Sequence, residues 1–403
     1  MISSLFYLER YRNEGTRTYS RHSDYSEAEL RYRPGSEEET FPLSVFNVPR
    51  ICLNIYTANP SEELRSRYLD NEHARFCIHP QVLEGFADDP YIEEIKQQGV
   101  VAPSLQVIPS SSTRTLYVKS DIPHALKVHF PYRISRYGRK MRDEVIEQAI
   151  NVSLDLEKGI DYFDDEFAFL REVIGVSYKD LDPEAERGEN WGYLVRDMAP
   201  FPPLDGDRIY IPGFALYGGD AFDREQPPLL YELIGTQNPL PFVLENLMFP
   251  IIRHWIQSYK TFGFMLEPHG QNVLLELNGD NSLTRIIHRD LSVGIDMRRR
   301  ADIGLDSEHL NSYNKMDYGE FCSITYDMFM GSHFFDRVVD CCLQKYSNLS
   351  EADFREPCKE LFADIFPEHE AYLPEEVHYF SEKRDQFNKP LYKNTGQKPA
   401  WRP

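Results

Sequence analysis

Residues 267–290 read EPHGQNVLLELNGDNSLTRIIHRD, in which two apolar runs are joined at the turn dipeptide Asn278-Gly279. An Asn-Gly pair between apolar runs is a strong signal for a β-hairpin, because both residues tolerate a positive φ angle. A loop centred near Asp280 would place Asp290 opposite residues 270–271. One end of the ribbon would then carry five polar side chains, Glu267, His269, Gln271, Asn272 and Asp290. Because oxygen and nitrogen groups of this kind suit Mg²⁺ and the oxyanions that it bridges, the ribbon end is the first candidate site.

The whole chain is acidic and contains enough apolar residues to fold. Its 403 residues carry a formal net charge of −21, and 41% of them are hydrophobic. This length predicts a buried core spread over more than one lobe. The negative charge argues against a nucleic-acid or anionic-membrane binder, since both surfaces attract positively charged proteins.

The sequence also predicts where the protein works. We find no apolar run near the roughly 18 residues of a membrane span, and Glu9 interrupts the N-terminal apolar residues. We therefore expect no membrane association and no signal peptide, and we expect a cytoplasmic location. The six cysteines show no metal-ligand spacing, so most should be reduced packing residues.

Residues 113–142 form a basic island in this acidic chain. The segment holds eight cations against the single acid Asp121, namely Arg114, Lys119, Lys127, Arg133, Arg136, Arg139, Lys140 and Arg142. Neighbouring cations repel one another, and a bound polyanion would neutralise this repulsion. A solvated basic face is the alternative interpretation.

A serine-rich loop at 109–115 leads into a strand of this island. Its hydroxyls, backbone amides and the Arg114 guanidinium suit phosphate oxygens. A hairpin centred near Asp121 would set Lys127 opposite Thr115, so that two cations flank the same anion. Arg139 precedes an amphipathic helix that starts near residue 141 and ends at Gly159. The amides of its first turn would add to the attraction of Arg139 for a carboxylate or phosphate.

The remaining patterns divide the chain into three parts. Strand patterns cluster between residues 105 and 130, whereas helical patterns dominate after residue 236, including 241–260 with a kink at Pro250. The predicted fold class is α+β. The expected parts are an N-terminal region 1–100 with a mobile or loosely packed segment at 10–40, a β-rich lobe 101–235 and a mainly helical lobe 236–403 that carries the hairpin.

Four blocks of sequence resemble the siderophore synthetases that work without nonribosomal peptide synthetases, the family of aerobactin synthetase. The blocks, in chain order, are His79-Pro80-Gln81, Ser111-Ser112-Thr113-Arg114-Thr115, Lys127 to Arg139 with Ser135 between them, and Glu267 to Asn272 with the later Arg289-Asp290. The chain resembles a compact form of this family. The resemblance implies a form without most of the N-terminal lobe, and the Trp expected between Pro80 and Gln81 is absent.

The resemblance implies a cupped-hand fold of several lobes, with a central antiparallel lobe that binds ATP and a helical C-terminal lobe. It implies adenylation of a polycarboxylate such as citrate, followed by condensation with an amine, hydroxamate or alcohol. The implied roles are ATP binding by Ser111, Ser112, Arg114, Thr115, Lys127 and Gln271, substrate binding by His79, Ser135, Arg139 and His269, catalysis by Arg139, His269 and Lys127, and Mg²⁺ binding by Glu267, Asn272 and Asp290.

Other interpretations stay open at this point. His288-Arg289-Asp290-Leu291 is superficially similar to a protein-kinase catalytic loop, but the Asn expected five residues after Asp290 is Ile295. A small-molecule phosphotransferase is therefore one alternative, and a noncatalytic carboxylate- or nucleotide-binding subunit is another. A homodimer, or a partner synthetase subunit that supplies the missing lobe, is equally compatible with the sequence.

Overall fold

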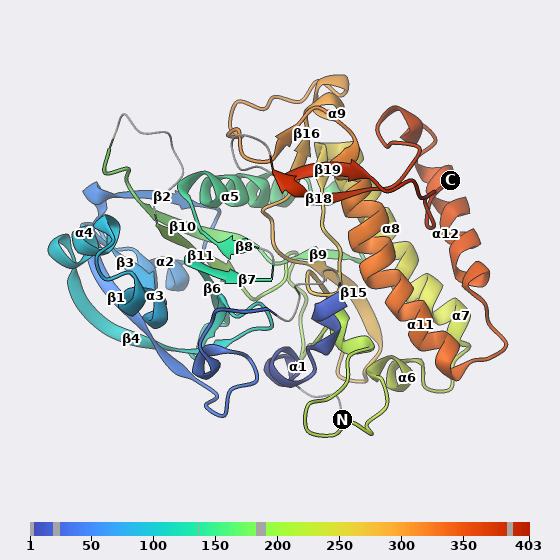
Figure 1. The fold of residues 1–403 in the computed structure, drawn as a ribbon, viewed down its shortest axis with the longest axis horizontal. Coiled ribbons are helices and arrows are strands. Elements are labelled where there is room, and N and C mark those ends of the chain that lie inside the picture. Colours follow the sequence, from blue (N-terminus) through green and yellow to red (C-terminus); the bar gives the residue numbers. More distant parts are fainter. Residues whose placement is uncertain (1–3, 19–24, 136, 183–190, 385–389) are drawn as a thin grey trace.

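The strands of the N-terminal half gather on one side of the computed structural model, and the long helices of the C-terminal half lie on the other (Figure 1). The structure describes residues 4–18, 25–135, 137–182, 191–384 and 390–403. The α+β class, with an antiparallel β-rich lobe and a mainly helical C-terminal lobe, is confirmed.

An eight-stranded sheet with antiparallel neighbours forms the β-rich lobe. Its order is β2 (Leu53–Thr57), β10 (Glu172–Tyr178), β11 (Gly192–Asp197), β6 (His124–Val128), β5 (Thr115–Val118), β4 (Val100–Pro109), β1 (Phe41–Pro49) and β3 (His73–Ile78). Thr115 pairs with Lys127, as predicted. The boundary expected at residue 100 does not separate two sheets, because β1–β3 join the same sheet as the later strands.

Helices cover both faces of this sheet. On one face, α2 (Glu62–Tyr68), α3 (Pro80–Gly85) and α4 (Pro90–Gln98) contribute buried side chains to one core. On the other face lies α5 (Asp143–Lys158), the helix predicted to end at Gly159. Gly175 and Gly192 let α5 approach, since a Cβ atom on either would lie within 2.4 Å of an Ile146 methyl carbon. Glycine at these two positions therefore sets the distance between α5 and the sheet.

A second sheet carries the predicted hairpin. Its order is β12 (Ile209–Pro212), β14 (Val273–Leu277), β15 (Leu283–His288) and β9 (Phe167–Phe169). The hairpin β14–β15 is confirmed, with Val273 opposite His288. Its turn differs from the expectation. The loop spans residues 278–282, and the positive φ angle falls on Asn281 at 66° rather than on the Asn278-Gly279 pair.

A small core joins the two sheets and places the hairpin against the β-rich lobe. Ile108 of β4 and Tyr117 of β5 pack there with Leu274 of β14 and Ile287 of β15. Burial of apolar side chains contributes about 1.5–3 kcal/mol each. This contact fixes the hairpin relative to the basic strands, although the two lie about 150 residues apart in the sequence.

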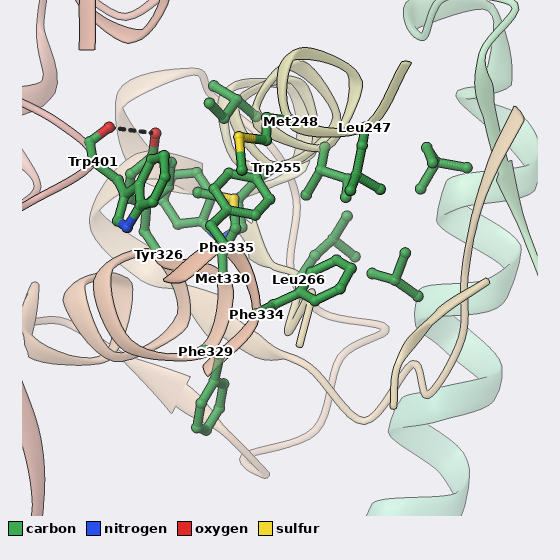
Figure 2. Packing of buried hydrophobic residues seen from close by; sticks show 14 of the residues in the cluster. Leu247, Met248, Trp255, Leu266, Tyr326, Phe329, Met330, Phe334, Phe335 and Trp401 are labelled. Atoms are coloured by element: carbon green, nitrogen blue, oxygen red, sulfur yellow. Dashed lines mark hydrogen bonds between the residues drawn. The ribbon is translucent and has the colours of Figure 1, made fainter. Parts of the chain in front are cut away.

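The helical lobe surrounds the largest core. Its helices are α6 (Leu229–Ile234), α7 (Pro239–Val243), α8 (Phe249–Phe262), α9 (Met297–Asp302), α10 (Glu320–Ser323), α11 (Asp336–Lys345) and α12 (Glu351–Ile365). A π-helical segment, Leu244–Met248, precedes Pro250, so the break expected at this proline falls just before it. A longer one, Ile324–Phe335, links α10 to α11. Figure 2 shows its residues Tyr326, Met330 and Phe335 packed with Trp255 and Trp401.

Short strands complete the structure. Three of them form a small sheet, in the order β13 (Phe264–Met265), β16 (Gly294–Asp296) and β17 (Lys315–Met316). Two further pairs are β7 (Phe130–Ile134) with β8 (Tyr137–Arg139), and β18 (His378–Arg384) with β19 (Pro390–Asn394). The chain begins with α1 (Leu5–Tyr11), which lies beside the second sheet (Figure 1). The pair β18–β19 is a β element inside the lobe expected to be mainly helical.

Buried side chains lie near both ends of the chain. In the segment 10–40, expected to be mobile or loosely packed, Arg12, Ala28 and Tyr32 are buried. The Arg12 guanidinium donates to the carbonyls of Gly218 and Pro227, which explains the difference. Near the C-terminus, the buried Arg402 pairs with Asp327 at 3.0 Å. Residues 19–24 lie outside the described residues.

The cysteines are reduced, as expected. All six cysteines are free thiols, and five of them are buried. Within the described ranges, every helix is too short or too polar to cross a lipid bilayer.

We expect the protein to lose stability in mild acid. Burial lowers the pKa of both His79 and His129 to about 3. An unfolded histidine has a pKa of about 6.5, so the unfolded chain binds more protons as the pH falls below that value. The free energy of unfolding should fall by about 1.4 kcal/mol per pH unit for each histidine, over the window from about pH 6.5 toward pH 3. Urea unfolding at pH 7.5, 5.5 and 4.5 measures this slope. His129→Asn removes one of the two histidines, so the slope should fall by about 1.4 kcal/mol per pH unit. An unchanged slope would contradict the account.

Candidate functional site

A cavity of about 270 Å³ lies between the eight-stranded sheet and the polar end of the β14–β15 hairpin. All of the predicted site residues except His79 line it. They are Ser111, Ser112, Arg114, Thr115, Lys127, Ser135, Arg139, Glu267, His269, Gln271, Asn272 and Asp290. The basic strands and the polar ribbon end therefore face one space. Their individual roles stay predictions.

The serine-rich loop is a tight turn that uses its own backbone amides. The amide of Thr113 donates to the carbonyl of Ser110 at 2.9 Å, and that of Arg114 donates to Ser112 at 2.8 Å. The amides of Ser112 and Thr115 donate to the Ser110 and Ser112 hydroxyls. Amides of this loop were expected to hold an anion, but these four amides donate to acceptors within the loop. The loop instead offers hydroxyls and the Arg114 side chain to the cavity.

Lys127 and Arg114 of the eight-stranded sheet contact residues of the cavity wall. The Lys127 ammonium donates to Asp290 Oδ1 at 2.5 Å, and only 4% of its side chain is exposed. The Arg114 guanidinium donates to the Arg139 carbonyl at 3.1 Å. Burial, with the neighbouring Arg139 charge, lowers the pKa of Arg114 to about 10. Arg114 therefore stays protonated at neutral pH, and both side chains line the cavity.

The ribbon end places two carboxyl groups in the cavity, those of Glu267 and Asp290. Burial, together with the charge of Asp290, raises the pKa of Glu267 to about 8. The pKa of Asp290 lies well below its usual range, because Lys127, Arg196 and Arg114 outweigh the effect of burial. Burial also lowers the pKa of His269 to about 4, so its imidazole is neutral. A cation between Glu267 and Asp290 would stabilise the ionised form of both carboxyl groups.

The donor set fits Mg²⁺ together with a phosphate ligand. In the described part of the chain, no group of three or more His, Cys, Asp or Glu side chains could by itself hold a metal ion. Mg²⁺ commonly takes one or two carboxylates and completes its shell with water and substrate phosphates. Glu267, Asp290 and the amide oxygen of Asn272 therefore suit a metal that arrives with a nucleotide.

The opposite wall of the cavity is aromatic and was missed by sequence reasoning. Phe329 comes from the long π-helical segment, and Tyr379 and Phe380 come from β18. Figure 2 shows Phe329 pointing away from the packed cluster of the same segment. Its ring meets that of His269 edge to face, with centroids 5.6 Å apart. The wall offers apolar and π surface to a ligand group that carries no charge.

Positive φ angles mark three positions in or beside the cavity. They occur at Thr113 (68°), Ser135 (61°) and Asp290 (72°). This conformation is uncommon for residues other than glycine and costs of order 1–3 kcal/mol each. Such residues cluster at ligand sites, where the surrounding structure holds them in place.

His79 is placed elsewhere. It is fully buried in the core of the β-rich lobe, where its ring contacts Tyr32, Phe41 and Phe130. Its Nδ1 atom accepts the amide of Gln81 at the start of α3. His79 is a helix cap in an apolar environment and is not among the residues that line the cavity, so its assignment to substrate binding stays a prediction.

Only part of the basic island reaches the cavity. Arg114, Lys127 and Arg139 line it, whereas Lys119 is exposed elsewhere and Arg136 lies outside the described residues. The first turn of α5 does not line the cavity and contains the acidic residues Asp143 and Glu144. Its amides therefore do not add to Arg139 as expected.

Proteins of known structure share this fold. The petrobactin biosynthesis protein AsbB from Bacillus anthracis str. Sterne aligns over 95% of this chain and 71% of its own, with a TM-score of 0.72 and 16% identity. The aerobactin synthetase IucC from a hypervirulent pathotype of Klebsiella pneumoniae aligns over 87% and 67%, with a TM-score of 0.66 and 14% identity. The ATP-bound aerobactin synthetase IucA from the same source aligns over 88% and 68%, with a TM-score of 0.67 and 14% identity.

These likenesses show that the chain shares the α+β fold of these siderophore-biosynthesis proteins. The IucA / IucC family model matches residues 21–217, which contain the serine-rich loop and the basic strands. The predicted resemblance to this family, in a compact form, is thus confirmed. A search of curated proteins found no significant match.

Proposed function

We propose that this chain is an ATP-dependent ligase of siderophore biosynthesis that joins a polycarboxylate, such as citrate or a citrate derivative, to an amine, hydroxamate or alcohol. The observation that carries the proposal is the convergence of Arg114, Lys127 and Arg139 with Glu267 and Asp290 in one cavity. A triphosphate and a polycarboxylate together are heavily anionic, and this set of cations offsets such a load.

The proposed reaction has two steps. In the first, a carboxylate oxygen of the acid attacks the α-phosphorus of ATP, and the bond between the α- and β-phosphates breaks to release pyrophosphate. In the second, the nitrogen or oxygen of the cosubstrate attacks the acyl carbon. The cosubstrate loses a proton, and AMP leaves with the electron pair of the broken acyl–oxygen bond.

The residues divide between the two substrates by their place in the cavity. The hydroxyls of Ser111, Ser112 and Thr115, with Arg114 and Lys127, would hold the phosphates, because the loop leads into β5 and Lys127 lies opposite Thr115 on the neighbouring β6. Gln271 donates to the Ser111 hydroxyl at 3.1 Å and would orient it.

The acid would lie at the other end of the cavity. Ser135 lies in the β7–β8 turn and Arg139 ends β8, and both line the cavity together with His269 of the ribbon end. A neutral His269 can accept or donate one hydrogen bond, whereas Arg139 supplies the charge that attracts a carboxylate. Mg²⁺ held by Glu267, Asn272 and Asp290 would neutralise phosphate charge as pyrophosphate leaves.

Nucleotide products test this proposal. The purified chain with Mg²⁺ and ATP should release AMP and pyrophosphate only when a polycarboxylate is present, and a panel of carboxylates and amines identifies the substrates. Chromatography separates AMP from ADP. Release of ADP would instead indicate a phosphotransferase, and carboxylate binding without nucleotide turnover would indicate a binding subunit.

A further inference from the structure

Glu9 lies between the two walls that would hold ATP, although sequence analysis gave it no role in the site. Its side chain is fully buried on α1. One carboxylate oxygen accepts the amide of Ser111 at 2.9 Å, and the other pairs with the Arg289 guanidinium at 2.6 Å. One side chain therefore contacts both the serine-rich loop and the ribbon end.

Arg289 and Gln271 close these contacts into a ring. The Arg289 guanidinium donates to the Gln271 carbonyl at 2.7 Å. The side-chain amide of Gln271 donates to the Ser111 hydroxyl at 3.1 Å. The ring runs from Ser111 through Glu9, Arg289 and Gln271 and returns to Ser111. Three of its links are hydrogen bonds and the link between Glu9 and Arg289 is an ion pair, and polar contacts in a buried network of this kind strengthen one another.

The helix that carries Glu9 is itself held by both lobes. Leu8 belongs to the core of the helical lobe, and the ring of Phe6 packs on Tyr117 of β5 with centroids 5.1 Å apart. The Arg289 guanidinium also donates to the Tyr117 hydroxyl at 3.1 Å. Contacts with both lobes therefore fix the position of α1, and with it the position of the Glu9 carboxylate.

We propose that Glu9 is a positioning residue for ATP, which sets the spacing between the Ser111 hydroxyl and the metal-binding ribbon end. Glu9 does not line the cavity, so it acts through Ser111 and Gln271. The inference rests on the proposed function. A glutamine at this position has one acceptor oxygen in place of two, so it cannot hold both the Ser111 amide and the Arg289 guanidinium, and the ring opens at one of these two links.

The test compares two buried ion pairs. Glu9→Gln opens the ring, whereas Glu276→Gln breaks the pair of Glu276 with Arg285, which is also buried and lies on the same hairpin outside the cavity. Calorimetric titration with MgATP and thermal unfolding are measured for both variants. We expect both to lose thermal stability, but only Glu9→Gln to raise the Kd for MgATP, by about 10- to 100-fold.

The outcomes separate this inference from the proposed function. An unchanged Kd in Glu9→Gln, or an equal rise in Glu276→Gln, would assign Glu9 a purely structural role and overturn the inference. If Glu9→Gln does not fold, Glu9→Asp keeps the charge on a shorter arm and should show an intermediate Kd. A wild-type Kd in Glu9→Asp would then overturn it. A wild-type chain that binds no MgATP would contradict the proposed function, and this inference with it.

Discussion

Asp290→Asn should reduce nucleotide turnover by about 10³-fold while the protein stays folded. Asparagine has nearly the same shape, but it removes the charge that faces Lys127 at 2.5 Å and the proposed Mg²⁺. The variant should still bind a carboxylate, because Arg139 is unchanged. The measurement is AMP release at saturating MgATP and acid, with circular dichroism to confirm folding.

Asp121→Asn is the matched control for this change. Asp121 also pairs with a cation, Arg67 at 2.6 Å, but 82% of its side chain is exposed. Exposed pairs contribute about 0–1 kcal/mol, so turnover and folding should both stay at wild-type values. Wild-type turnover in Asp290→Asn would show that the ribbon end is not the metal site.

Arg114→Ala and Arg139→Ala should separate the two substrates. Arg114 shares a wall with the serine-rich loop, so its loss should raise the Kd for MgATP by about 10- to 100-fold with a smaller effect on the acid. Arg139→Ala should raise the KM for the acid by a similar factor and leave MgATP binding nearly unchanged. Titration with MgATP and steady-state kinetics with varied acid measure the two effects.

Lys119→Ala is the control for the loss of positive charge. Lys119 belongs to the same basic island but is exposed outside the cavity, so neither ligand should respond. The Arg114 guanidinium donates to the Arg139 carbonyl at 3.1 Å, and the double variant measures any coupling between the two residues. Equal effects of both single variants on both ligands would contradict the division of the cavity.

Short-range sequence patterns predicted the strand pairings that involve residues close together in the sequence. The pairing of Thr115 with Lys127 follows from a short hairpin, and the pairing of Val273 with His288 follows from two apolar runs around a turn. Register is strongly specified where one face of a strand is buried, because a slip by one residue would move its apolar side chains to the wrong face. Both hairpins meet this condition.

The features that the sequence did not reveal depend on contacts between distant residues. Glu9 meets Ser111 and Arg289 only after α1 packs between the lobes, and no local pattern marks such a contact. Phe329 and Phe380 form one wall because a π-helical segment and a C-terminal strand happen to meet. His79 carried a matching motif, yet its side chain caps a helix in a core. A motif gives residue types, whereas packing decides which way they face.

The most direct test is a crystal structure with Mg²⁺ and an ATP analogue that cannot be cleaved between the α- and β-phosphates. The account predicts the triphosphate between the serine-rich loop, Arg114 and Lys127, with the metal ion on Glu267, Asn272 and Asp290. A nucleotide bound on another face of the molecule, with none in this cavity, would contradict it.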